Sequence, residues 1–231
     1  MVYVMTDIHG DFYHFYQMLV LINFSRSDKL FILGDVLDKG EENLCLLDFI
    51  RGTSNIYLLK GNHELCCENY LRGKISRRLW DIYGGINTRV EVDQLPDEKK
   101  RELAEYLSSL PIWEKVVIHG QEYLLTHSGY CNSFKVVKDG KIDIESSIKK
   151  AVESNEEKYL ISHDIHTLRH GERLDKLVIV GHFPTIFLKE SQSNQIYFSK
   201  NYINLDTGNG HREIGGRLAC LRLEDNKAFY V

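Results

Sequence analysis

Three short segments in the first third of the chain carry side chains that commonly bind metals. They are Asp7-Ile8-His9-Gly10, Gly34-Asp35-Val36-Leu37-Asp38-Lys39-Gly40 and Gly61-Asn62-His63-Glu64. Each segment follows an apolar run of the kind that predicts a buried strand. Loops at the carboxyl ends of such strands meet at one edge of an open α/β sheet. We therefore expect the three segments to converge on one site.

The donor atoms in these segments suit divalent metals of intermediate hardness. The candidate ligands are Asp7, His9, Asp35 and Asn62. Asp35 is the natural bridging ligand for two metals, which at about 3.5–4 Å apart activate a shared water and hold the non-leaving oxygens of a phosphoryl group. Four side chains are too few for two metals. His127 and His182 each follow a later apolar run and are suited to supply the missing nitrogens.

The apolar patterns also predict the elements that position these loops. Strands are predicted at 2–6, 29–33 and 55–59, with helices at 11–24 and 41–50. This βαβαβ order is typical of a mostly parallel sheet. A helical section is predicted at about 64–110. After Pro111 the pattern favours hairpins, with apolar runs at 113–118, 123–126, 178–180, 195–198, 202–205 and 218–223. These later runs predict a second sheet packed on the first.

Composition limits the class of protein. With 231 residues, 43% of them hydrophobic, the chain is long enough for a full core, and we expect one domain over residues 1–231. We find no long apolar run and no signal-like amino terminus, so we expect a cytoplasmic protein with no membrane partner. The net charge of −4 disfavours an extended nucleic-acid surface. The five cysteines lack zinc-finger spacing and are predicted to be reduced structural thiols.

Five motifs follow one another in the order of a known family. They are Asp7-x-His9-Gly10, Gly34-Asp35-x-x-Asp38-Lys39-Gly40, Gly61-Asn62-His63-Glu64, His127-x-Gly129 and Gly181-His182 before Pro184-Thr185. The chain thereby resembles the calcineurin-like metallophosphoesterases, in particular the phosphoprotein phosphatases with their bacterial and phage members and the related dinucleoside-tetraphosphate hydrolases. The tail around Asp206 is similar to the family's carboxyl end. The resemblance implies an α/β fold in which two mixed sheets form an α-β-β-α sandwich with helices outside.

The resemblance also implies a role for each motif residue. One metal would be held by Asp7, His9 and Asp35, and the second by Asp35, Asn62, His127 and His182. His63 would be the general acid that protonates the leaving oxygen, and Asp38 would fix the tautomer of its imidazole and favour its charged form. Water, rather than a side chain, is the implied nucleophile. Two divalent ions are implied as cofactors, with Mn²⁺ expected and Fe or Zn compatible with the same ligands.

Two lysines depart from the family's pattern. The family has arginines at the positions of Lys39 and Lys60, and those arginines clamp the phosphate. Lysine keeps the positive charge but loses the planar two-point grip of a guanidinium group. Lys39 and Lys60 are therefore candidate substrate-binding residues, and these two changes bear on phosphate affinity and substrate choice more than on the metal site.

A third phosphate-binding arginine of the family has no clear counterpart in this chain. His163, Arg169 and Arg173 all remain open as replacements. Tyr130, just beyond the fourth motif, is a candidate to line the substrate pocket, and His211 is a candidate to border it. Glu64 is assigned a packing or capping role behind its loop.

The resulting hypothesis is a metal-dependent phosphomonoesterase similar to protein serine/threonine phosphatases, acting on a phosphorylated protein, a peptide or a small phosphate ester. The alternative is a hydrolase of dinucleoside tetraphosphates or other phosphoanhydrides, which would use the same metals. A catalytically silent metal-binding scaffold would be expected to lack a ligand or the acid His63, whereas this chain keeps them all. An enzyme of RNA ends or cyclic phosphates is disfavoured by the acidic charge balance. The oligomeric state does not follow from these patterns.

Overall fold

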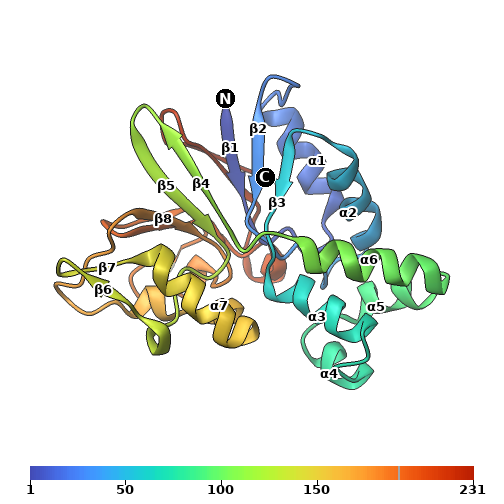
Figure 1. The fold of residues 1–231 in the computed structure, drawn as a ribbon. Coiled ribbons are helices and arrows are strands. Elements are labelled where there is room, and N and C mark those ends of the chain that lie inside the picture. Colours follow the sequence, from blue (N-terminus) through green and yellow to red (C-terminus); the bar gives the residue numbers. More distant parts are fainter. Residues whose placement is uncertain (192) are drawn as a thin grey trace.

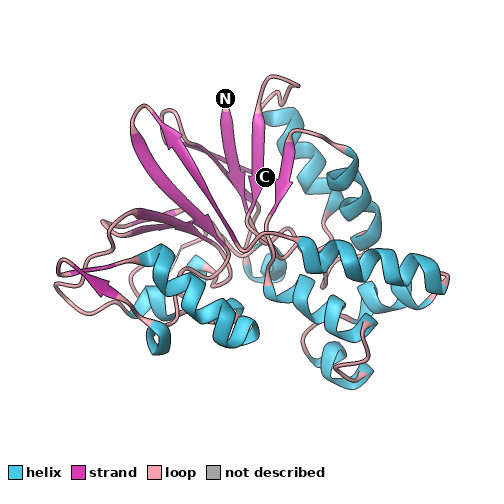
Figure 2. Cartoon of the chain, viewed as in Figure 1, coloured by secondary structure: helices cyan, strands magenta, loops and turns pink. Residues whose placement is uncertain are grey.

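Two five-stranded sheets form the centre of the molecule. The structure is a computed structural model that describes residues 1–191 and 193–231. Within these residues the sheets have the strand orders β12-β11-β1-β2-β3 and β4-β5-β8-β10-β9. Helices lie outside the sheets (Figure 2). The predicted α/β sandwich of two mixed sheets with outer helices is confirmed.

The first sheet contains the strands that precede the three motif loops. These strands are β1 (Val2–Met5), β2 (Lys29–Ile32) and β3 (Ile56–Leu58), and they run parallel, with Val4 opposite Phe31 and Phe31 opposite Tyr57. The connections are α1 (Phe12–Leu21) and α2 (Asn43–Gly52). Asp11 ends the first loop and begins α1, because its side chain accepts a hydrogen bond from the backbone N–H of His14 at 3.1 Å. The predicted βαβαβ unit is confirmed.

The carboxyl-terminal strands lie in a different sheet from the one predicted. The run at 218–223 was expected in the second sheet, but β11 (Ala219–Arg222) pairs antiparallel with β1 in the first sheet. The following strand, β12 (Lys227–Tyr230), extends that sheet to its edge. Periodicity reports which residues of a strand are buried, not which partner strand covers them, so it could not decide between the sheets.

The second sheet combines a hairpin with parallel strands. β4 (Trp113–Ile118) and β5 (Gln121–Thr126) form the expected hairpin. The other strands are β8 (Leu177–Val180), β9 (Tyr197–Phe198) and β10 (Tyr202–Asn204). Because β5, β8 and β10 run parallel, the prediction of hairpins throughout this half was wrong.

A long helix in the second half was not predicted. It is α7 (Ile144–Leu160), which follows the small ribbon of β6 (Val137–Lys138) and β7 (Lys141–Ile142). Its buried residues Ile144, Ile148 and Ala151 have helical spacing, but Asn155 has a non-helical backbone (φ −166°) that interrupts the pattern. The helix packs on the second sheet (Figure 1). Because Asn155 interrupts the helical spacing, the periodic stretch was too short to predict this helix.

Residues 62–109 form four helices. They are α3 (Asn62–Leu71), α4 (Arg77–Ile82), α5 (Ile86–Asp93) and α6 (Asp97–Ser109). Ser76 caps α4, and Asp97 and Glu98 in the first turn of α6 complement the helix dipole. In the described residues no helix combines the length and apolarity needed to cross a membrane.

The apolar core between the sheets fixes the loops that follow their strands. Val4 and Leu33 from one sheet pack in the same fully buried cluster as Leu125 and Ile179 from the other. Burying each such side chain contributes about 1.5–3 kcal/mol. Past the strand ends, the backbone of Asp7 donates to the carbonyl of Gly34 at 3.1 Å, which joins the first two loops. The sandwich therefore brings the loop residues into one place.

Candidate metal centre

The motif loops adopt a backbone conformation that non-glycine residues seldom adopt. Six site residues have positive φ: Asp7 (52°), His9 (54°), Asp35 (53°), Asp38 (73°), Lys39 (66°) and His182 (70°). Such conformations are costly for L-residues and persist where the surrounding structure enforces them, typically at functional sites. The turns also need close backbone approach: a Cβ atom on Gly61 would collide with Asp35, and one on Gly181 with Asp7. The loops are therefore shaped to hold side chains at short range.

One group of donors gathers around His127. Its Nε2 atom lies 2.9 Å from Asn62 Oδ1, 3.2 Å from His182 Nδ1 and 3.4 Å from Asp35 Oδ2. Its Nδ1–H donates to the backbone carbonyl of Leu33 at 2.9 Å, which directs Nε2 toward the other donors. These four side chains come from loops of both sheets, and they form one compact ligand cluster.

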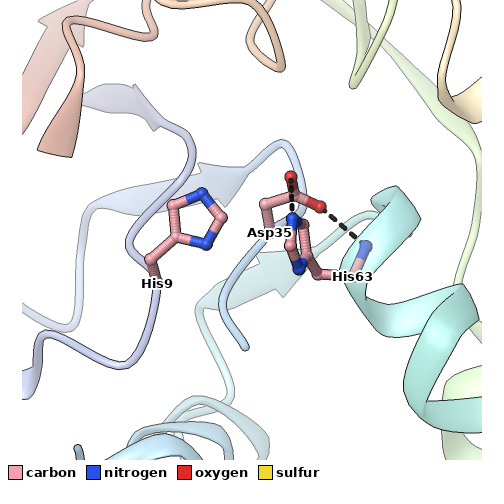
Figure 3. A group of neighbouring side chains, drawn as sticks. All are labelled: His9, Asp35 and His63. Carbon is pink, nitrogen blue, oxygen red and sulfur yellow. Dashed lines mark hydrogen bonds and ion pairs between the residues drawn. The ribbon is translucent and has the colours of Figure 1, made fainter. Parts of the chain in front are cut away.

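The other group consists of His9, Asp35 and His63, and it shares Asp35 with the first (Figure 3). The Nδ1–H of His9 donates to the carbonyl of Leu37 at 3.0 Å, so its Nε2 faces the site. Asp7 Oδ1 lies 3.9 Å from this Nε2 atom. The remaining contact is with Lys39, whose Nζ donates to His9 Nε2 at 3.0 Å. Asp35 thus lies between two clusters of donors, as expected of a bridging ligand.

Burial and the neighbouring charges shift the pKa values of the site histidines in different directions. Burial, with the positive charge of Lys39, lowers the pKa of His9 well below its usual value, so its Nε2 carries no proton and accepts the hydrogen bond from Lys39. Burial likewise lowers the pKa of His182 to about 3. Burial also lowers the pKa of His127, but the Asp35 carboxylate outweighs it and raises the value to about 9. A proton on His127 therefore competes with a metal for the same atom.

The donor set fits two divalent metals. Carboxylate, imidazole and amide groups converge on Asp35. The Nδ1 atoms of His9 and His127 are already bonded to backbone carbonyls, which leaves their Nε2 atoms as candidate metal ligands. Asp7 is held in the same way, since its Oδ2 accepts from the Thr6 hydroxyl and from the backbone N–H of His182. These residues form a set of candidate ligands whose side chains are already oriented by hydrogen bonds.

His63 lies beside the donors in a buried relay with Asp38 and Trp80. Its Nδ1 is 2.7 Å from Asp38 Oδ2, and the same oxygen accepts from the indole Nε1–H of Trp80 at 2.9 Å. Its Nε2 lies 3.8 Å from Asp35 Oδ2. Burial lowers the pKa of His63, but the Asp35 and Asp38 carboxylates outweigh it and the net shift is upward. The two carboxylates therefore favour the protonated form of the imidazole.

Glu64 holds the loops from behind. Its Oε2 accepts from the backbone N–H groups of Asp35 and Gly61 at 2.8 and 2.9 Å, and its Oε1 accepts from those of Val36 and Leu37 at 2.9 and 3.3 Å. The side chain is fully buried. One carboxylate therefore fixes the backbone of both the second and the third motif loops.

The substrate-binding candidates have different positions. Lys39 and His211 line a pocket of about 90 Å³ together with the donor residues His9, Asp35, Asn62 and His182. Lys60 and Tyr130 do not line this pocket. The Nζ of Lys60 is paired with Glu68 at 3.0 Å and Glu156 at 3.1 Å, and Tyr130 packs in the core beneath α7. The structure therefore brings Lys39 to the site and gives Lys60 and Tyr130 other surroundings.

Two buried residues of the site had no assigned role at the sequence level. Asp206 lines the same pocket, and its Oδ1 accepts from the backbone N–H of Gly208 at 2.9 Å. Burial, with the charge of Asp7, raises its pKa well above the usual value. The tail motif around Asp206 was the available signal for it. Trp80 had none, because its partner Asp38 is distant in the sequence.

None of the three candidates to replace the family's third arginine lines this pocket in the described part of the chain. The ring of His163 stacks on Phe183 with centroids 5.6 Å apart. A different cation, Arg212, lines an adjoining pocket of about 310 Å³ that shares Lys39 with the donor pocket. The Nε of Arg212 donates to Asp11 Oδ2 at 3.0 Å, so its charge is already paired.

Comparison with known sequences identifies a family and several relatives. The profile of the calcineurin-like phosphoesterase family matches residues 1–215. A symmetrical bis(5'-nucleosyl)-tetraphosphatase of Haemophilus ducreyi is 31% identical over 135 residues, covering 55% of this chain and 44% of that protein. That of Wigglesworthia glossinidia brevipalpis is 40% identical over 65 residues, covering 27% of this chain and 24% of that protein. The matches thus span less than half the length of these curated relatives.

Solved structures share the architecture at low sequence identity. A protein provisionally described as a diadenosine tetraphosphatase superposes with a TM-score of 0.59 at 17% identity, covering 100% of this chain and 92% of that one. A cold-active protein-tyrosine phosphatase of a Shewanella species gives 0.58 at 17% identity, with coverages of 99% and 79%. At such identities the likeness concerns the fold alone. Because the family profile extends over nearly the whole sequence and the fold agrees with it, the chain belongs to the calcineurin-like phosphoesterase family.

Proposed function

We propose that this chain is a binuclear metal-dependent hydrolase whose substrates are dinucleoside tetraphosphates. The observation that carries the proposed chemistry is the convergence of metal donors on Asp35 with the His63–Asp38 pair beside them. The symmetrical tetraphosphatases among its curated relatives support the substrate class.

The proposed ligands divide into two sets that share Asp35. Asp7 and His9 complete one set, and the other contains Asn62, His127 and His182. Two divalent ions, with Mn²⁺ proposed and Fe or Zn compatible, would activate water for attack on phosphorus and hold its non-leaving oxygens. The His127 and His9 rings are kept in place by their bonds to the Leu33 and Leu37 carbonyls.

His63 is proposed as the general acid. Its raised pKa favours the protonated imidazole, and the ring lines the pocket while Nδ1 is fixed on Asp38. Protonation of the leaving oxygen at this atom would prevent the build-up of charge as the bond to phosphorus breaks. Asp38 acts through His63, and Trp80 fixes the carboxylate of Asp38 in turn.

Lys39 is proposed as the phosphate-binding cation. It extends into the pocket from the loop after β2, where its backbone N–H donates to the Gly84 carbonyl at 3.0 Å. Its ammonium group donates a hydrogen bond to His9 Nε2. If a metal coordinated that nitrogen, the ammonium group would be free to turn toward a phosphoryl oxygen. A point charge of this kind attracts phosphate without the fixed orientation of a guanidinium.

A phosphomonoesterase acting on phosphoproteins is the second candidate. The adjoining pocket of about 310 Å³ shares His9 and Lys39 with the donor pocket, and its lining includes the carboxylates of Glu41, Glu42 and Glu213. An acidic surface beside the scissile phosphate attracts a basic peptide and repels a long phosphate chain. This charge pattern favours a phosphopeptide with basic residues near the phosphate.

A substrate comparison distinguishes the candidates. We expect diadenosine tetraphosphate to be hydrolysed with a higher kcat/KM than a phosphoserine peptide flanked by arginines, in parallel assays with Mn²⁺, Fe²⁺ and Zn²⁺. The reverse order would support the phosphopeptide candidate. Asp35→Asn is the control, since loss of the bridging carboxylate should abolish both activities and exclude a contaminating hydrolase. Activity with neither substrate, nor with p-nitrophenyl phosphate, would refute both.

A further inference from the structure

An exposed aromatic ring packs against a residue that lines the donor pocket. Pro184 and His211 line that pocket opposite the motif loops. Phe187 packs edge-on against His211, with ring centroids 5.3 Å apart and an interplanar angle of 80°. Phe187 is 49% exposed. Phe187 therefore contacts the donor pocket through His211, which lines it.

The segment that carries His211 is tied to the metal-binding loop. Asn209 Nδ2 donates to the carbonyl of Ile8 at 2.8 Å, and Arg212 Nε donates to both Asp11 and Asn209. The backbone N–H of His211 donates to the Gly208 carbonyl at 2.8 Å. Because these bonds reach the loop that carries the first metal ligands, the His211 ring has a fixed position relative to the donors.

The segment that carries Phe187 is also fixed. It is a short 3₁₀ turn, Thr185–Phe187, in which the N–H of Phe187 donates to the Pro184 carbonyl at 2.9 Å. The N–H of Thr185 donates to the carbonyl of Asp206, itself a pocket residue, at 2.8 Å. Two rings on two rigid segments thus meet at a set distance from the phosphate site.

The chemistry of this ring pair suits a flat aromatic group rather than another phosphate. Burial and the Lys39 ammonium lower the pKa of His211, so the ring is neutral at pH 7 and offers phosphate no charge. A base stacked on an aromatic side chain gains about 1–3 kcal/mol, whichever base it is. A half-exposed phenylalanine next to a phosphate site therefore matches a nucleotide, in which a base follows a phosphate chain.

We propose that Phe187, supported at its edge by His211, is the stacking platform for one nucleobase of the substrate. The proposal rests on the proposed function, since it assigns the base of a dinucleoside tetraphosphate to this ring. Phe187 would act on binding and not on the chemical step.

The test measures the contribution of the base to binding. With Mn²⁺ present, the wild-type protein should bind ADP, the product of symmetrical cleavage of diadenosine tetraphosphate, more tightly than pyrophosphate in calorimetric titrations. In Phe187→Ala the affinity for ADP should fall roughly 5- to 100-fold while that for pyrophosphate stays unchanged, and Phe187→Trp should restore it. The KM for diadenosine tetraphosphate should rise by a similar factor with kcat unchanged.

A matched control is available in Phe198, which is 48% exposed on β9 and does not line the donor pocket. Phe198→Ala should leave all these constants unchanged. Equal losses of ADP and pyrophosphate binding in Phe187→Ala, or no loss of either, would overturn the platform even if the tetraphosphate is hydrolysed. Base-dependent binding without hydrolysis would uphold the platform and overturn the proposed substrate.

Discussion

Lys60 joins the two halves of the molecule through a buried ion cluster. Its Nζ lies 3.0 Å from Glu68 Oε2 on α3 and 3.1 Å from Glu156 Oε1 on α7, and Glu68 Oε1 also accepts from Arg72 Nε at 2.9 Å. The Lys60 and Glu68 side chains are 3% and 7% exposed. The family's phosphate-clamping arginine at this position is thus replaced by a lysine whose charge is already paired.

The change Lys60→Met keeps most of the side-chain stem and removes the charge. Breaking a buried pair costs about 3–5 kcal/mol, because the partner charge stays buried. Two features favour the lower end of this range. Arg72 remains beside Glu68 in the variant. Glu156 is 32% exposed, so its pair with Lys60 contributes only about 0–1 kcal/mol to stability. We expect the free energy of unfolding to fall by about 3 kcal/mol.

The pH dependence gives this prediction a second readout. Burial raises the pKa of Glu68, but the hydrogen bond and charge of Lys60, with those of Arg72, outweigh it and the net shift is downward. A carboxyl with a lowered folded-state pKa stabilises the protein above its unfolded pKa, and this stabilisation is lost as the pH falls. The difference between wild type and Lys60→Met should therefore be largest near neutral pH and shrink in acid.

Urea denaturation followed by circular dichroism measures both effects. Lys99→Met is the control, because Lys99 pairs with Glu102 at 2.6 Å at the surface, with side chains 60% and 47% exposed, and its loss should shift the unfolding midpoint little. An unfolding midpoint for Lys60→Met equal to that of the control would refute the argument. Inhibition by inorganic phosphate should be unchanged in folded Lys60→Met, whereas a tenfold weaker inhibition would show that Lys60 binds phosphate after all.

Three further predictions concern the site. His63→Asn should lower kcat by about 10²–10⁴ with unchanged metal content by atomic emission, and normal turnover would exclude the acid role. Lys39→Arg should tighten competitive inhibition by phosphate, since a guanidinium grips two oxygens; an unchanged inhibition constant would place Lys39 away from the phosphate. Glu64→Gln should lower the free energy of unfolding in urea by about 1–3 kcal/mol and weaken Mn²⁺ binding, because the –NH₂ group of the glutamine would face backbone N–H groups. Wild-type stability together with wild-type Mn²⁺ affinity would contradict the role of Glu64 in holding the two loops.

Local patterns were enough to predict the first three strands and their connections. Those strands are continuous apolar runs, a helix begins at the capping residue Asp11, and each ligand follows a strand end. These signals depend on neighbours within a few residues. The second half lacked them at decisive points: α7 is interrupted at Asn155, and the pairing of β11 with β1 joins segments from opposite ends of the chain.

The sequence by itself determined which residues are candidate metal ligands, because residue type and position after a strand single out Asp7, Asp35, His127 and their companions on converging loops. Only the tertiary structure decided which cation lines the donor pocket. Lys39 and Lys60 look equivalent in sequence, yet Lys39 extends into the pocket while Lys60 pairs with Glu156, which lies 96 positions further along the chain. The physical reason is that a charged side chain turns toward the partner that tertiary packing places beside it. Such a partner can be distant in the sequence, so no pattern of neighbouring residues predicts it.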